Sequence, residues 1–172
     1  MLSYKHMDSP VGRLKLVADG SSLMAVLWTN DKPTRITLGD MQEDLHHPVL
    51  CEAECQLTEY FNGERTTFEL PLHVRGTPFQ KHVWQQLLHI PYGHTRSYGQ
   101  LALAIGRGSA SRAVGLANSK NPLSIVVPCH RVIGASGKLT GFAGGIETKA
   151  KLLKLEGVLE GHKLLSLSSG VV

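Results

Sequence analysis

The residues best suited to covalent chemistry in this sequence are Cys129, His130 and Arg131, which directly follow Pro128. The thiolate is the nucleophilic form of cysteine, and neighbouring cationic or proton-accepting groups lower the pKa of a thiol. Cys129 therefore has the neighbours of an activated nucleophile. The alternative is that Cys129 is a small core residue and His130 a buried histidine whose hydrogen bonds are satisfied. The pair by itself leaves both interpretations open.

A carboxylate further along the chain stands in an unusual place. A helix is expected from about Glu147 to Leu155, and Glu156 follows at its carboxyl end, where a negative charge opposes the helix dipole. A specific partner such as His130 would explain this placement. The alternative is an exposed and mildly unfavourable glutamate.

Two capping boxes mark helices that must lie upstream of the cysteine. Thr77–Gln80 predicts the start of a helix with an apolar stripe, and this helix should end at Pro91–Gly93. Ser97–Gln100 repeats the capping-box spacing and predicts a short helix to about Ile105, which Gly106–Gly108 interrupts.

A third helix is expected from about Ser109 to Asn118. Two short helices joined by a glycine-bearing turn have the sequence pattern of a helix-turn-helix, and an ordinary helical hairpin has the same pattern. The third helix carries Arg112 among small residues and has no set of side chains that would read several base edges. Such a helix would approach a nucleic-acid groove closely and with little sequence preference.

The earlier part of the chain has strand periodicity. Alternation over Arg13–Asp19 and the apolar run Leu23–Trp28 predict a small antiparallel sheet, and the polar stretch Thr29–His47 is expected to be loop. Val49–Phe61 suits a helix that ends at Asn62-Gly63. The apolar segment that ends at Val127 predicts a buried strand immediately before the reactive cysteine.

These elements predict an α/β (α+β) domain over residues 1–75 and a mostly helical domain of winged helix-turn-helix type over residues 76–172. The core of the second domain is expected at 76–160, with the tail after His162 loosely held. The chain has 172 residues, of which 42% are hydrophobic, enough for a real core.

Composition limits the classes of partner and compartment. The chain has an odd number of cysteines, 3, and no apparent secretion signal, which indicates reduced thiols and a cytoplasmic protein. The longest purely apolar run, Leu23–Trp28, is too short to span a membrane. A formal charge of +4 permits a polyanionic partner without requiring one.

The segment Pro128–Val132 closely resembles the active-site signature of the O6-alkylguanine-DNA alkyltransferases, in particular of the bacterial members. The resemblance is strong from about Gly76 to Gly157. Further matches at the spacing of the family are Arg112–Gly115, Asn121-Pro122, Gly134, Gly137, Gly144-Gly145 and Glu156-Gly157.

The resemblance implies DNA repair by direct reversal of damage. One alkyl group would pass irreversibly from O6-alkylguanine in double-stranded DNA to Cys129 after base flipping, with O4-alkylthymine as a second candidate substrate. His130 would be the base, acting through a bound water, and Glu156 would orient it. Asn121 would hold the hinge before the active site, and Tyr98 would donate a hydrogen bond to the guanine ring.

The resemblance also implies roles for residues that contact DNA and the base. Arg112 would enter the duplex and replace the extruded base, and the other DNA contacts would come from Tyr98, Ala113, Gly115 and Asn118. The guanine pocket would be formed by Phe142, Ala143, Gly144 and the carbonyl of Val132. The family often has tyrosine where this chain has Phe142, so a hydrogen bond from that hydroxyl is not expected here. No metal or organic cofactor is implied, and the protein would act as a monomer.

Four other interpretations of the sequence have specific requirements. Cys51 and Cys55, with His46 and His47 upstream, suggest a zinc site but lack a Cys-x-x-Cys pair or a second half-site. A damage-recognition protein of the alkyltransferase-like class would lack the reactive cysteine, and an alkylation-sensing transcription factor would carry a four-cysteine zinc domain. A Cys-His hydrolase would turn over and would not need Arg112.

Overall fold

The computed structural model describes residues 1–158, which form two compact units. The first unit comprises Met1–Arg75 together with Pro122–Val126, and the second comprises Gly76–Asn121 and the chain from Val127 onward. The expected tail after His162 and the expected end of the core at 160 lie outside the described residues. No helix within residues 1–158 combines the length and apolarity needed to cross a bilayer.

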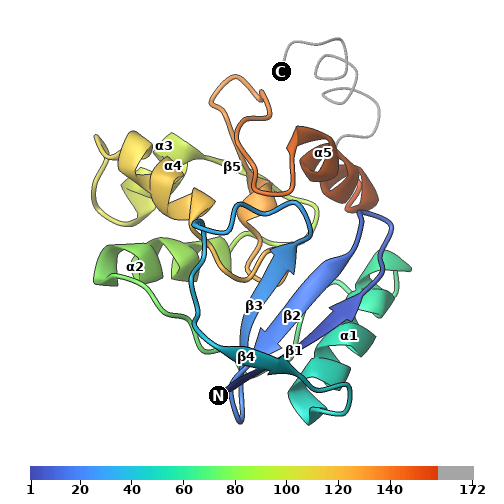
Figure 1. Cartoon of the computed structure of the whole chain (residues 1–172). Coiled ribbons are helices and arrows are strands. Elements are labelled where there is room, and N and C mark those ends of the chain that lie inside the picture. The colour runs from blue at the N-terminus through green and yellow to red at the C-terminus, as the bar shows by residue number, and fades with distance from the viewer. Residues whose placement is uncertain (159–172) are drawn as a thin grey trace. The chain divides into compact units, whose positions relative to one another are not determined.

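The first unit contains a four-stranded sheet and one helix (Figure 1). The strands are β1 (Leu2–Met7), β2 (Leu14–Ala18), β3 (Leu23–Trp28) and β4 (Met41–Glu43), in the order β3-β2-β1-β4. The pairs β1/β2 and β2/β3 are antiparallel, and β2/β3 corresponds to the antiparallel pair predicted from Arg13–Asp19 and Leu23–Trp28. The helix α1 (Pro48–Phe61) packs against β1, β2 and β3.

One strand of this sheet was missed by the sequence patterns. β4 lies inside the stretch Thr29–His47 that was expected to be loop, and it pairs in parallel with β1 from Leu2↔Met41 to Tyr4↔Glu43. The prediction was wrong there because a three-residue edge strand is too short to show a period.

The second unit is mostly helical, with α2 (Pro78–Leu87), α3 (Tyr98–Ala104), α4 (Ser111–Ser119) and α5 (Ile146–Leu155). Both predicted capping boxes are present, at the starts of α2 and α3. The helices α3 and α4 pack on each other, as a helix-turn-helix requires. A short parallel pair, β5 (Arg96–Ser97) with β6 (Val132–Ile133), completes the unit.

The segment before the cysteine is not the buried strand that was expected. Its one bridge joins Leu123 to Val26, and its backbone turns twice, through hydrogen bonds from Val126 N to Ser124 O and from Cys129 N to Val127 O. Each bond joins residues two positions apart, which is the geometry of a γ-turn. The amides of Val126 and Cys129 are therefore bonded within the segment itself, whereas in a strand they would bond to a neighbouring strand. Ile125 has φ 74°, a conformation that β-branched residues rarely adopt.

Candidate active site

Cys129 begins a single 3-10 turn, Cys129–Arg131, and is 5% exposed. Two buried asparagines hold the backbone on either side of Pro128. Asn121 Nδ2 donates to the Val127 carbonyl at 2.8 Å, and Asn118 Nδ2 donates to the Cys129 carbonyl at 3.4 Å. The end of α4 and the residues after it therefore fix the peptide that carries the thiol.

His130 and Glu156 meet as the sequence suggested. His130 Nε2 donates to Glu156 Oε2 at 2.7 Å, and both side chains are fully buried. Glu156 is the C-cap of α5, so its cost against the helix dipole is offset by a specific partner. The other ring nitrogen, Nδ1, has no hydrogen-bond partner among the described residues and can therefore accept a proton.

The charges of this pair follow from burial and from Arg131. Burial lowers the pKa of His130, against the opposing influence of Glu156, so the imidazole is neutral near pH 7. Burial opposes ionisation of Glu156, but hydrogen bonds and charges from His130 and Arg131 outweigh it and hold the pKa of the carboxyl at about 2. A neutral imidazole beside a carboxylate carries its proton on Nε2, and this leaves Nδ1 as the basic atom.

Sequence reasoning treated Arg131 only as a cationic neighbour of Cys129, and its contact with Glu156 was missed. Its Nε donates to Glu156 Oε1 at 2.8 Å, its Nη2 to Glu156 Oε2 at 3.1 Å, and its Nη1 to the Ile90 carbonyl at 2.7 Å. The one signal in the sequence was its place directly after a candidate Cys-His pair.

Lys149 is a second residue that was missed. It is fully buried on α5, and its Nζ donates to the carbonyls of Val132 at 2.5 Å and Thr140 at 3.0 Å. Burial lowers its pKa to about 8, although the nearby Cys129 acts in the opposite direction. The signal was its spacing, because Lys149 falls on the same helical stripe as the buried Leu152, Leu153 and Glu156.

Tyr98, the first residue of α3, lies where it can reach the loop between β6 and α5. Its hydroxyl is 3.0 Å from Thr140 Oγ1, and its ring lies beside Gly115 of α4, where an added Cβ would be 3.6 Å from it. The expected pocket residues Phe142, Ala143 and Gly144 are half-buried in the same loop. A turn closes there through the bond from Gly145 N to Phe142 O at 2.9 Å.

The predicted DNA-contact residues lie at different depths on α4. Arg112 and Ala113 are exposed, and Gly115 is half-buried. Asn118 is 4% exposed, and its amide contacts the active-site turn. As the side chain lies here, Asn118 faces the interior of the unit, away from the exposed side of the helix.

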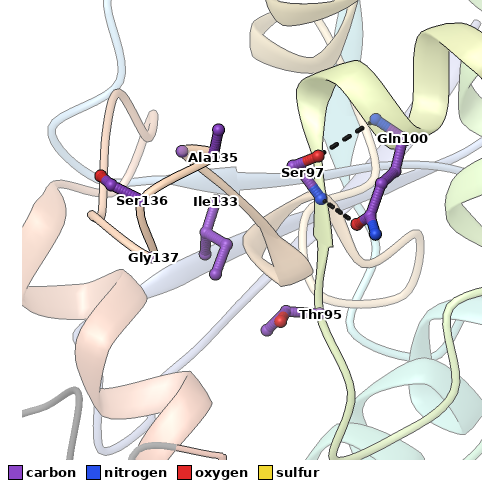
Figure 2. A pocket seen from close by; sticks show the side chains of 8 residues that line it. Thr95, Ser97, Gln100, Ile133, Ala135, Ser136 and Gly137 are labelled. Atoms are coloured by element: carbon purple, nitrogen blue, oxygen red, sulfur yellow. Dashed lines mark hydrogen bonds between the residues drawn. The ribbon is translucent and has the colours of Figure 1, made fainter.

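A cavity of about 340 Å³ opens next to this site (Figure 2). It lies between the start of α3 and the chain after β6, and the Ser97 and Gln100 side chains in its wall are engaged with each other's backbone amides. The residues that line it are Thr95, Ser97, Gln100, Ile133, Gly134, Ala135, Ser136 and Gly137. Neither Cys129 nor the expected guanine-pocket residues are among them.

The two cysteines of α1 lie outside this site. Cys51 and Cys55 are exposed, and none of the three cysteines forms a disulfide within residues 1–158. Within residues 1–158 no three His, Cys, Asp or Glu side chains are grouped in a way that could hold a metal ion.

Two family models match consecutive parts of the chain. The ribonuclease-like domain of 6-O-methylguanine DNA methyltransferase matches residues 2–74, and the DNA-binding domain of the same family matches residues 78–158. The chain belongs to the 6-O-methylguanine DNA methyltransferase family. The resemblance seen in the Pro128–Val132 signature is thereby confirmed.

Relatives in the 6-O-methylguanine DNA methyltransferase family align over nearly their whole length. Proteins named methylated-DNA–protein-cysteine methyltransferase include one from Mycobacterium leprae, 49% identical over 91% of this chain and 93% of the relative. Another, from Methanosarcina acetivorans, is 49% identical over 90% of this chain and 97% of the relative. A crystal structure of Mycobacterium tuberculosis OGT in complex with DNA matches with TM-score 0.84 and 48% identity, over 94% of this chain and 97% of that one.

Proposed function

We propose that this chain repairs DNA by moving an alkyl group from O6 of guanine to the Cys129 sulfur, once per molecule and irreversibly. The observation that carries this proposal is the buried His130–Glu156 hydrogen bond of 2.7 Å beside a buried cysteine, in the same unit as a helix-turn-helix. Family membership and the 48% identity to a relative solved with DNA support it.

The thiol loses its proton to His130. Because Nε2 donates its hydrogen bond to Glu156, Nδ1 is the ring nitrogen that accepts this proton, through an intervening water. The resulting imidazolium lies against a carboxylate that Arg131 keeps ionised, so Glu156 stabilises the positive charge as it forms.

The thiolate then attacks the alkyl carbon. The new C–S bond takes its electron pair from sulfur, and the breaking C–O bond leaves its pair on the guanine, which departs as the neutral base after protonation of its ring. Tyr98 donates the hydrogen bond that favours this departure. No group in the site can cleave the thioether, so repair ends with S-alkylcysteine, and transfer requires neither a metal nor an organic cofactor.

The lesion reaches the thiol only outside the duplex, because Cys129 is 5% exposed. We assign the contacts with the duplex to the exposed residues of α4, with Arg112 in the space of the extruded base and Ala113 and the half-buried Gly115 against the groove. Asn118 we assign to the active-site turn, because its amide is used there. The extruded base would lie against Phe142, Ala143, Gly144 and the Val132 carbonyl.

We also propose the domain boundary between Arg75 and Gly76, a monomeric protein, and a cytoplasmic location. The odd number of cysteines, 3, supports reduced thiols and a reducing compartment. Binding to double-stranded DNA would have little sequence preference, because the exposed side chains of α4 read few base edges.

Intact-protein mass after incubation with duplex DNA that carries O6-methylguanine tests the function. The expected result is one added methylene mass per molecule, on Cys129 and absent in Cys129→Ser. Lesion binding without modification would favour a damage-recognition protein. Multiple turnovers without modification would favour a hydrolase and would contradict the proposal.

A further inference from the structure

Lys149 is an ammonium group enclosed in the second unit without a carboxylate partner among residues 1–158. Burial lowers its pKa to about 8, so the folded protein holds the charged form at a free-energy cost. Even a buried ion pair can often be replaced by apolar side chains of similar volume without loss of stability, and this ammonium has no carboxylate among residues 1–158 to offset its desolvation. Stability alone therefore gives little reason for a lysine at this position.

What the ammonium holds together gives the reason. Val132, in β6, lies one residue beyond the Cys129–Arg131 turn, and Thr140 lies in the loop Gly134–Gly145. The Thr140 hydroxyl is also 3.0 Å from the Tyr98 hydroxyl. A single buried donor thus connects the strand after the reactive cysteine with the loop that carries Phe142, and Thr140 extends the connection to the start of α3.

Apolar packing alone would leave this connection loosely defined. Leu139 is buried against Leu153 and anchors the loop to α5. Apolar contacts are non-directional, whereas hydrogen bonds from a charged donor favour one distance and one direction. Leu139 can therefore hold the loop near α5, but the bonds of Lys149 set the separation between the carbonyls of Val132 and Thr140.

We propose that Lys149 is a positioning residue for alkyl transfer, and that its ammonium holds the Val132 carbonyl and the loop Gly134–Gly145 at the spacing that seats the damaged guanine against Cys129. The inference rests on the proposed function, since it assigns the guanine pocket to these two segments. Lys149 acts through the Val132 and Thr140 backbone and does not itself react.

The test compares Lys149→Met with Lys151→Met, which changes an exposed lysine on the same helix. In Lys149→Met, hydrogen exchange of the Gly145 amide, which donates to the Phe142 carbonyl within the loop, should accelerate about 10-fold in the free protein, because the loop opens more often. The limiting single-turnover rate of methyl transfer from O6-methylguanine duplex should fall about 10- to 100-fold, the worth of lost hydrogen bonds to a charged group. Duplex affinity should change less than about 3-fold, because salt-dependent phosphate contacts come from other residues. Lys151→Met should match the unmodified protein in all three measurements.

A second electrophile separates positioning from a direct effect of charge on the thiol. Iodoacetamide alkylates Cys129 without a seated guanine. Its rate, followed on the Cys129 peptide so that the exposed Cys51 and Cys55 do not contribute, reports the reactivity and access of the thiolate without the positioning of the base. In Lys149→Met, the rate of methyl transfer from DNA should fall by about 10-fold more than the rate of the iodoacetamide reaction. This difference of about 10-fold is the lower end of the effect of losing hydrogen bonds to a charged group. Equal losses would mean that Lys149 acts only on the thiolate, and would overturn the proposal. Unchanged loop exchange would overturn it as well.

A milder variant guards against a folding defect. Thr140→Val keeps the carbonyl that Lys149 binds and removes only the hydroxyl near Tyr98. Exchange of the Gly145 amide should be slower in Thr140→Val than in Lys149→Met, and equal exchange in the two variants would contradict the role of the lysine. Hydrogen exchange needs no lesion, so its outcome stands even if the unmodified protein fails to transfer an alkyl group.

Discussion

Arg131 donates to both oxygens of the Glu156 carboxylate, from Nε to Oε1 at 2.8 Å and from Nη2 to Oε2 at 3.1 Å. This paired geometry keeps a buried carboxylate ionised where it can orient His130. The catalytic pair thus depends on a third residue, and a change at Arg131 should affect both stability and chemistry.

Arg131→Lys should be harmful despite the retained charge. An ammonium cannot reproduce the two parallel bonds, so the free energy of unfolding should fall by about 2 to 4 kcal/mol, comparable to breaking a buried ion pair. Methyl transfer should also slow, because Glu156 loses its fixed orientation. Urea unfolding and single-turnover transfer measure the two effects, with the exposed Arg107→Lys as control. Wild-type values for Arg131→Lys would show that the bidentate geometry is unimportant.

Glu156 should give stability a specific acid dependence. Its pKa is about 2 in the folded protein and 4.5 ordinarily, so the unfolded chain binds more protons between these values. Its contribution, about 3 kcal/mol at 1.36 kcal/mol per unit, is complete above pH 4.5 and is lost as pH falls toward 2.

Urea unfolding of the wild type and of Glu156→Gln between pH 2 and 6 isolates this contribution. Asp19 also has a pKa of about 2, held there by hydrogen bonds from the Ser21 amide and from His73, so the wild type alone would combine the two carboxylates. The difference between the two proteins should grow with pH across this window. Parallel curves would refute the assignment.

Ile125 should reverse the usual order of alanine and glycine. Its φ of 74° is unfavourable for any residue with a Cβ, by roughly 1 to 2 kcal/mol. Ile125→Gly should therefore unfold at higher urea concentration than Ile125→Ala, although both lose a buried side chain. At Val126, whose φ is not positive, the alanine variant should be the more stable one. The same order at both positions would contradict the prediction.

Arg112 should matter most when the lesion lies in a duplex. Filling the space of an extruded base offsets the cost of unpairing and unstacking, and that cost is smaller in a single strand. Arg112→Ala should therefore slow transfer from duplex O6-methylguanine more than transfer from the same lesion in a single-stranded oligonucleotide. Equal slowing of both would point to simple phosphate binding. Single-turnover rates on the two substrates decide between these roles.

The sequence by itself determined the features that depend on near neighbours. The helix starts at Thr77 and Ser97 could be predicted because a capping box closes its hydrogen bonds within three residues. The family signature at Pro128–Val132 is equally local, and the placement of Glu156 against its helix dipole already called for a partner such as His130.

Only the tertiary structure decided where buried polar groups find their partners. Arg131 meets Glu156 across 25 positions of sequence, and Lys149 meets Val132 across 17. β4 is a strand because its backbone pairs with β1. The side-chain amide of Asn118 points inward because it donates to the Cys129 carbonyl. No local pattern encodes these pairings, because a desolvated polar group must be satisfied by whatever residue the folded chain brings beside it.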